Sequence, residues 1–238
     1  MTRYGQFCPI AKALELLAER WTLLIIRELL MGSRRFNDLS RGVPLMAPSM
    51  LSQRLKTLAE GGILVRERSA DGHSYEYRLT PAGEELRPLI MQLGTWGQRW
   101  SRSSMESHDL DASLLMWDIR RNLHVDKLPQ QRAVIHFEFP DAPKGMRRWW
   151  LVIDEGEVDL CLEDPGTEVD VTLSTSVRTM TRIWMGDLSL AQGRTQGILK
   201  VLGPARLVRC LGEWLGASTF AHVPPAAIAP ARKAALVQ

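Results

Sequence analysis

Three leucines in the first half of the chain recur at the spacing of one helical face. Leu51, Leu55 and Leu58 follow the i, i+4, i+7 pattern of a helix that buries one side, and Pro48 favours the start of that helix. The opposite side is polar and partly basic, and it carries Ser49, Gln53, Lys56 and Glu60. The pattern predicts an amphipathic helix with an exposed face rich in hydrogen-bonding groups.

Two strand-like runs follow this helix and predict a β-hairpin. Residues 63–68 and 75–79 are rich in β-branched and aromatic side chains, and a pair of glycines separates the first run from the helix. The two runs are joined around Asp71-Gly72, which is a strong signal for a tight turn. Arg68 and His73 would lie near the tip of this hairpin.

The order of these elements is more specific than any one of them. Residues 34–39 predict a short helix and residues 41–44 a turn, and the polar-faced helix and the hairpin come next. This is the order of a helix-turn-helix with a wing, whose second helix enters the major groove of DNA. A polar helix face on its own is more often simply solvated, so the interpretation depends on the order.

The polar face supplies side chains suited to DNA. Glutamine can pair with adenine through two hydrogen bonds, while serine, lysine and arginine can contact bases or phosphates. The residues predicted to contact DNA are Arg34, Arg35, Ser49, Ser52, Gln53, Arg54, Lys56, Arg68 and His73.

A long helical pattern follows the hairpin over residues 81–100 and has a wide apolar face. The residues of that face are Leu86, Leu89, Ile90, Leu93, Trp96 and Trp100. Such a face needs a partner, which is either the core of its own domain or a second copy of the chain. Dimerisation is the favoured interpretation, with the two tryptophans as a buried anchor.

Five short motifs within residues 5–101 resemble the HxlR family of winged helix-turn-helix regulators, relatives of the MarR type. They are Cys8-Pro9-Ile10-Ala11 and residues 20–29, 35–39, 51–55 and 77–83. The resemblance implies a DNA-binding regulator, and the helix after the wing commonly forms a dimer in this family, which suits palindromic operators. Ala47 departs from the family pattern of a serine before the helix-starting proline, so this helix lacks a good N-cap.

Composition and charge agree with two domains. The 238 residues are 45% hydrophobic, enough for each half to bury its own core. Residues 1–104 hold 15 Lys and Arg against 10 Asp and Glu, whereas residues 105–238 hold 15 against 17, and the basic excess of the first half suits phosphate contact. The sequence shows no signal peptide and no membrane span, so a cytoplasmic location is expected.

The apolar pattern changes to period two from about residue 130. Residues 133–139 and 169–173 alternate apolar and polar positions, and residues 149–153 and 158–162 predict a further hairpin. Helices are expected at residues 111–121 and 176–185. The second half is therefore expected to be an α+β domain and not a second DNA reader.

This half resembles the sterol-carrier-protein-like fold over residues 130–216. The resemblance rests on residues 169–174, 184–190 and 198–203, and on a closing helix over residues 204–215. Members of that fold hold an apolar ligand between sheet and helices, which by analogy implies a pocket lined by Met180, Ile183, Trp184, Leu188 and Leu190. A dry core filled by the same residues is an equally good interpretation.

Other chemistry has little support. The three cysteines form no CxxC or disulfide pattern, the five histidines are dispersed, and GxSxG, P-loop and GxGxxG motifs are absent, so no metal site, cofactor or enzyme activity is expected. Cys8 directly precedes Pro9, a favoured first helical residue, and some regulators that resemble this family sense oxidants through a cysteine there. A redox role for Cys8 thus stands beside the commoner structural role.

Together these patterns predict an α+β protein: an N-terminal winged helix-turn-helix, mainly α with a β-hairpin wing, and an α+β sterol-carrier-like domain. The expected boundaries are residues 1–104 for DNA binding and dimerisation, 105–129 for a helical linker, 130–220 for the second domain and 221–238 for a flexible tail. The expected function is transcriptional regulation by a homodimer on double-stranded operator DNA, modulated by an apolar small molecule. The alternative is a lipid or small-molecule carrier whose helix-turn-helix is a dimerisation platform. The operator, the effector and the sign of regulation are not encoded in these patterns.

Overall fold

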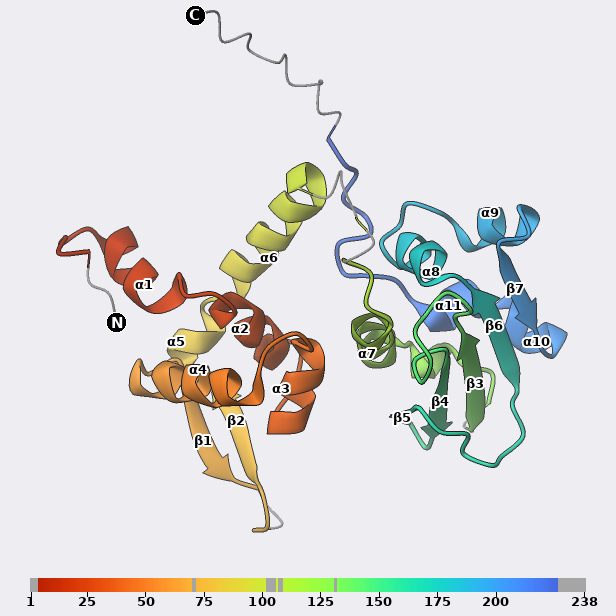
Figure 1. Cartoon of the computed structure of the whole chain (residues 1–238), viewed down its shortest axis with the longest axis horizontal. Helices are drawn as coiled ribbons and strands as arrows, with labels where there is room; N and C mark the ends of the chain where they lie inside the picture. The colour runs from red at the N-terminus through yellow and green to blue at the C-terminus, as the bar shows by residue number, and fades with distance from the viewer. Residues whose placement is uncertain (1–3, 70–71, 102–105, 107–108, 131, 227–238) are drawn as a thin grey trace, which may run out of the picture.

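The computed structural model describes residues 4–69, 72–101, 106, 109–130 and 132–226. Within this part of the chain, the helices and strands form two halves (Figure 1), and each half has its own hydrophobic core. The first half is a winged helix-turn-helix and the second is an α+β domain, as the sequence predicted.

The winged-helix half is built around the leucine face of its fourth helix. Its elements are α1 (Pro9–Leu17), α2 (Thr22–Leu30), α3 (Phe36–Gly42), α4 (Pro48–Glu60), β1 (Leu64–Arg68), β2 (Tyr75–Leu79), α5 (Pro81–Glu84), α6 (Arg87–Trp96) and a π-helical turn, η1 (Gly97–Ser101). Leu51, Leu55 and Leu58 of α4 are between 0% and 2% exposed, which confirms the predicted face. Ala47 precedes α4 without a side-chain cap, so the helix start relies on the fixed backbone of Pro48.

The wing is an antiparallel hairpin of β1 and β2. Its register runs from Leu64 opposite Leu79 to Arg68 opposite Tyr75. The backbone N–H of Tyr77 donates to the carbonyl of Arg34 at 2.8 Å, which ties the wing to the segment before α3. Of the predicted Asp71-Gly72 turn, Asp71 lies outside the described residues.

The prediction of one helix over residues 81–100 was wrong in detail. The structure has two helices there, α5 and α6, and α6 then passes into η1. Pro88 lies in the first turn of α6, where it has no N–H to donate to the preceding turn, and this favours a break before it. The Thr80 hydroxyl caps α5 by accepting from the Gly83 N–H at 3.2 Å.

The second half is a five-stranded sheet with helices. Its elements are α7 (Ala112–Asn122), a 3₁₀ turn η3 (Val125–Lys127), β3 (Ala133–Glu138), β4 (Arg148–Asp154), β5 (Glu157–Cys161), β6 (Val171–Thr175), α8 (Val177–Trp184), α9 (Leu190–Thr195), β7 (Leu199–Leu202), α10 (Ala205–Arg209) and α11 (Leu211–Leu215). The strand order is β5-β4-β3-β6-β7, and β3 runs parallel to β6 while the other neighbours are antiparallel. The alternating apolar residues of β3 and β6 face the core, as their period of two predicted.

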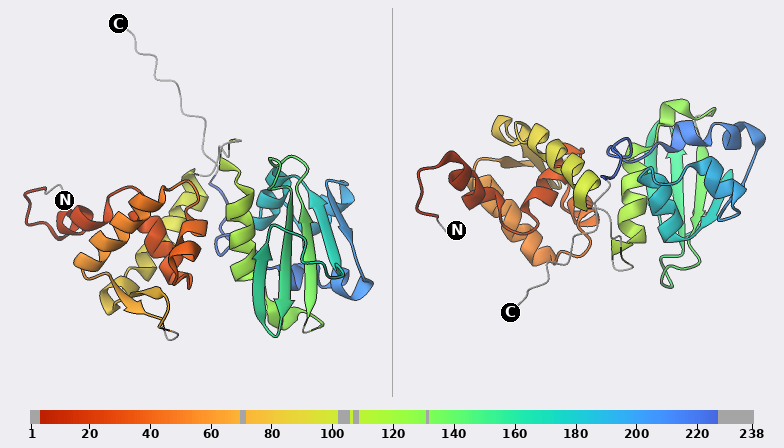
Figure 2. Two further views of the ribbon diagram at one scale, coloured as in Figure 1. Left: turned by 60° about the horizontal axis from the view of Figure 1, so that its bottom comes forward. Right: turned by 90° about the horizontal axis from the view of Figure 1, so that it is seen from above.

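Helix α7 was expected in a linker, but it packs into the second core. Leu115, Met116 and Ile119 are all buried there, and the helix lies between the winged-helix half and the sheet (Figure 2). Its N-cap is as predicted, because an Asp111 oxygen accepts from the N–H of Ser113 at 2.7 Å. The segment is thus a structural layer at the junction between the two halves.

The end of the described chain also departs from the expectation. The predicted closing helix is divided at Cys210, whose backbone dihedrals leave the helical region, into α10 and α11. Residues 216–226, here called the C-terminal strap, then return toward α8 and η1: Ser218 N–H donates to the Trp184 carbonyl at 2.9 Å, and Ala226 N–H to the Arg99 carbonyl at 2.8 Å. Residues 227–238 of the predicted tail lie outside the described residues.

Candidate functional site

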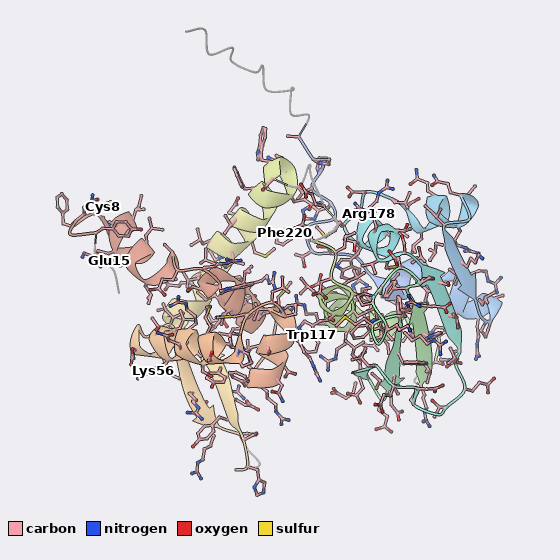
Figure 3. The ribbon with its side chains drawn as sticks, viewed as in Figure 1. Cys8, Glu15, Lys56, Trp117, Arg178 and Phe220 are labelled. Carbon is pink, nitrogen blue, oxygen red and sulfur yellow. The ribbon has the colours of Figure 1, made fainter. Side chains whose placement is uncertain are left out.

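Helix α4 presents a polar surface away from its buried leucines. Ser49, Ser52, Gln53 and Lys56 are all exposed, and Figure 3 shows Lys56 on the outer side of the helix. The ammonium group of Lys56 lies 3.8 Å from the Glu60 carboxylate, and both side chains are exposed, so the pair is weak. This face therefore offers an amide, hydroxyls and a cation to a partner.

Arg34 and Arg54, both predicted to contact DNA, have other partners in the structure. The guanidinium of Arg34 donates to the Leu29 carbonyl at 2.9 Å and so closes the end of α2. The guanidinium of Arg54 is paired with Glu19, and its Nε is buried without a hydrogen-bond partner. Both arginines stabilise the winged-helix half in this conformation, and neither is presented on the surface of α4.

The wing contributes several basic side chains. One of them, Arg66, was not among the predicted DNA contacts. Arg68 and His73 are exposed, and so is Arg66, whose guanidinium lies 3.8 Å above the Tyr75 ring. The period of two along β1 gave a signal for Arg66, since it is two residues from Arg68. The ring holds the guanidinium in place without neutralising its charge.

A groove of about 690 Å³ separates the wing from α3 and α4. Arg35 and Ser52, both predicted, line it together with Asn37, Arg66 and Tyr75. The one carboxylate among its described lining residues, that of Asp38, lies 3.7 Å from the Arg41 guanidinium. Hydrogen-bond donors thus converge from three elements on one hollow surface. A phosphate backbone is the kind of ligand that such a set of donors recognises.

The apolar residues of α6 and η1 divide into two groups. Ile90 is buried and Leu86 half-buried in the first core, so these two residues close the domain and are not available to a partner. Leu89, Leu93, Trp96 and Trp100 are 47% to 58% exposed. Helix α1 and the segment before it add further exposed apolar side chains, namely Tyr4, Phe7, Ile10 and Leu14.

The residues predicted to line a ligand pocket lie in or against the second core. Met180, Ile183, Trp184 and Leu188 are buried, and Leu190 packs against them. Trp184 differs from the rest in one respect, because it also lines a cavity of about 220 Å³ between the two halves.

A buried carboxylate joins the two halves beside that cavity. Glu28 of α2 is 0% exposed, and its Oε2 accepts hydrogen bonds from Arg121 Nη1 at 2.6 Å and from Trp117 Nε1 at 3.2 Å, both from α7. Its Oε1 accepts from Arg27 at 3.0 and 2.7 Å. Trp117 lies at the junction in Figure 3, with the Arg41 guanidinium of α3 5.5 Å from its ring.

The same network continues into the second half. Arg121 Nη2 donates to Asp118 at 2.5 Å, and the other Asp118 oxygen accepts from Trp184 Nε1 of α8 at 2.6 Å. Burial alone would lower the pKa of Arg121, but attraction to Glu28 and to Asp118 outweighs it, so the pKa is raised and the guanidinium stays charged. Sequence reasoning missed this network, because Glu28 and Arg121 are 93 residues apart.

The remaining candidates have simple surroundings. Cys8 is half-exposed immediately before α1, where it is the N-cap residue without a side-chain cap bond. Among the described residues, no group of three or more His, Cys, Asp and Glu side chains is arranged to hold a metal ion. None of the helices in the described part of the chain is both long and apolar enough to cross a membrane.

Comparison with known proteins gives two family matches and several relatives. Residues 16–105 match the HxlR-like helix-turn-helix family, and residues 122–215 match the SCP-2 sterol transfer family. The HTH-type transcriptional regulator Rv3095 of Mycobacterium tuberculosis is 46% identical over 92 residues, which are 38% of this chain and 58% of that protein. The HTH-type transcriptional regulator YvaP of Bacillus subtilis is 34% identical over 98 residues, which are 40% of this chain and 91% of that protein.

Among solved structures, the reduced form of the transcriptional regulator YodB from B. subtilis is 30% identical and covers 39% of this chain and 93% of its own, with a TM-score of 0.35. Of the two relatives named above, the chain spans 91% of the length of YvaP but only 58% of the length of Rv3095.

Proposed function

Because the chain belongs to the HxlR-like helix-turn-helix family, we propose that it is a transcriptional regulator that binds operator DNA as a homodimer. The observation that carries the proposal is the exposed face of α4 beside a basic wing. A recognition helix needs such a face, with its apolar side fixed in the core. The leucines of α4 provide that fixed side.

Each exposed group has a distinct role in this proposal. Gln53 lies in the middle of α4 and reads a base edge, with adenine as the base whose donor and acceptor match its amide. Lys56 near the end of α4 and Arg66 and Arg68 on the wing neutralise phosphates. Arg34 and Arg54 position the helix and the wing through their internal contacts.

The proposed dimer interface uses the exposed apolar residues of α6, η1 and α1. Leu89, Leu93, Trp96 and Trp100 supply large side chains that water does not solvate well, and Phe7 before α1 is 98% exposed. Several large exposed apolar side chains on one helix are typical of an interface between proteins. A two-fold dimer then places two α4 helices on two half-sites of one operator.

We further propose that an apolar small molecule modulates DNA binding through the sterol-carrier-like half. The apolar cavity at the junction between the two halves supports this. The second candidate function, a carrier whose helix-turn-helix is only a dimerisation platform, shares the ligand but predicts no sequence-specific DNA binding.

Fluorescence anisotropy with the promoter fragment next to the protein's own gene separates these candidates. The regulator should bind that fragment more tightly than a shuffled sequence, and its affinity should fall with added salt, because each neutralised phosphate contributes about −0.9 to the slope of log affinity against log salt. Replacing Lys56 with alanine should reduce that slope by about 1. Equal affinity for both fragments would favour the carrier.

A further inference from the structure

The cavity between the two halves has an apolar wall built from several elements. Its apolar lining consists of Met31 directly after α2, Leu114 and Leu115 from α7, Trp184 and Met185 at the end of α8, and Phe220 from the C-terminal strap. Figure 3 shows Phe220 between α6 and α8. A cavity with this lining favours an apolar ligand over water, which needs several polar partners.

The charged groups at the wall are already satisfied within the protein. Asp118 accepts from Arg121 and Trp184, Asp111 caps α7, and Asp109 accepts from the Glu106 N–H at 2.9 Å. Arg27 donates to Glu28 and to the Gly42 carbonyl. An ionic ligand would have to break one of these pairs and bury its own charge, which is costly. The chemistry of the wall therefore selects a neutral molecule.

The volume sets the size of that molecule. An apolar cavity of about 150 Å³ stays dry and binds benzene. The cavity here is about 220 Å³ and is partly open to solvent, so it encloses one or two fused rings, whereas most of a sterol or a long acyl chain would lie outside it. Met180, Ile183 and Leu188, which an interior carrier site would use, are instead packed in the second core.

We propose that this junction cavity is the effector site, that it takes a compact neutral ring compound, and that its occupancy changes DNA affinity. The inference rests on the proposed regulatory function and gives it a site, a ligand class and a route. The site lies between the domains and not inside the sterol-carrier-like fold.

The first route from the cavity leads to the DNA-reading helices. Asp118, Arg121 and Trp184 line the cavity, and Arg121 is bonded to Glu28 of α2. Glu28 in turn lies against α3, where a Cβ at Gly42 would overlap the carboxyl group. A ligand that moves Arg121 or Asp118 therefore acts on α2 and α3, which support α4.

The second route leads to the proposed dimer helix. Phe220 covers the cavity with one side and contacts α6 at Gly94, where an added Cβ would overlap the phenyl ring. The neighbouring Gln98 amide donates to the Met185 carbonyl at 3.3 Å. A ligand in the cavity therefore acts both on the helices of the winged-helix half and on the proposed dimer surface, which sets the distance between the two DNA half-sites. A ligand shifts this system only if it prefers one of two arrangements.

The test uses the full chain and three neutral two-ring probes, naphthalene, indole and 2-naphthol. Saturation-transfer NMR measures probe binding, and anisotropy measures operator affinity with and without each probe near its solubility limit. At least one probe should bind and change the affinity by at least about fivefold, the lower end of typical couplings. Palmitate, which is charged and most of whose chain the cavity cannot enclose, should not compete with the probe.

Two variants and a matched control locate the site. Leu114→Trp and Thr181→Leu both fill the junction cavity, whereas Leu190→Trp adds the same bulk in the sterol-carrier-like half outside it. Circular dichroism first verifies that each variant is folded. The quantity measured for each variant is the ratio of its operator affinity with probe to its operator affinity without probe. Leu114→Trp, or Thr181→Leu if the first does not fold, should bring the ratio to one, and Leu190→Trp should keep the wild-type ratio.

Three outcomes would overturn the inference. They are the absence of binding by all three probes, binding without a change in operator affinity, and loss of the probe effect in Leu190→Trp but not in the two filling variants. In each case specific DNA binding without probe would still support the proposed function. Failure of the unliganded protein to prefer its promoter would instead remove the proposed function itself.

Discussion

Replacing Glu28 with glutamine should destabilise the protein far more than the loss of one charge on its surface would. The carboxylate receives donors on both oxygens, from Arg27, Arg121 and Trp117. An amide of the same shape has one acceptor oxygen, so the donors that meet its NH₂ group lose their acceptor. Removing one partner of a buried ion pair typically costs about 3 to 5 kcal/mol.

Two features of the structure reduce the expected loss of stability below that range. The side chain of Arg27 is 26% exposed and can regain water, while that of Arg121 is 10% exposed and keeps Asp118 as a partner. The amide oxygen also retains part of the hydrogen bonding. We therefore expect a loss of about 2 to 3 kcal/mol in the free energy of unfolding.

Urea denaturation followed by circular dichroism measures this loss. Glu84→Gln is the matched control, because Glu84 pairs with Arg87 at 2.7 Å with both side chains about half exposed, and such a pair contributes at most about 1 kcal/mol. A double-mutant cycle of Glu28→Gln with Arg121→Met should give a coupling of about 0.5 to 3 kcal/mol, as for contacting residues. A loss for Glu28→Gln no larger than that of the control would refute the role of Glu28 in joining the two halves.

Three further predictions concern the dimer, pH and oxidation. Leu89→Ala with Trp96→Ala should yield monomers in analytical ultracentrifugation and weaken operator binding, because one half-site alone binds weakly; an intact dimer would move the interface elsewhere. Burial, assisted by Arg148 and opposed by Glu138 and Asp164, lowers the pKa of His136, which stacks on Trp150 at 4.9 Å. As the pH falls, the unfolded chain therefore protonates His136 before the folded protein does, so the free energy of unfolding should fall as the pH drops below about 6.5. The urea midpoint of His136→Phe should fall less over the same pH range. Identical pH profiles of wild type and variant would exclude this contribution of His136. If Cys8 senses oxidants, peroxide should change the DNA affinity of the wild type but not that of Cys8→Ser, and an equal response of both would rule the role out.

Local patterns were sufficient to predict several elements in both halves of the chain. The leucine face of α4, the wing and the N-cap at Asp111 depend on near neighbours in sequence, and the structure has all three. The break between α5 and α6 was also encoded locally, by Pro88, but the continuous apolar spacing obscured it. Period and composition thus identify elements better than they identify their ends.

Partnerships between distant residues were not accessible in this way. Arg54 is a basic residue on the helix that was predicted to read DNA, yet its guanidinium is paired with Glu19. Only the packing of α4 on the segment before α2 brings these two residues together. Trp117 is buried, and its ring lies at the junction between Arg41 and Arg120, a contact that the helical spacing of α7 does not predict. A buried ion pair such as Glu28 with Arg121 leaves no signature in either local sequence, because each residue alone looks like an ordinary charged position on a helix.

The central claim is that the exposed face of α4 reads DNA, and base-resolved binding tests it most directly. The measurement compares the affinities of the wild type and Gln53→Ala for every single-base-pair variant of the operator fragment. Gln53→Ala should lose about 1 to 3 kcal/mol of discrimination at the same position of each half-site and little elsewhere. An equal loss across all sequences, or no loss at any position, would contradict the assignment of α4 as the recognition helix.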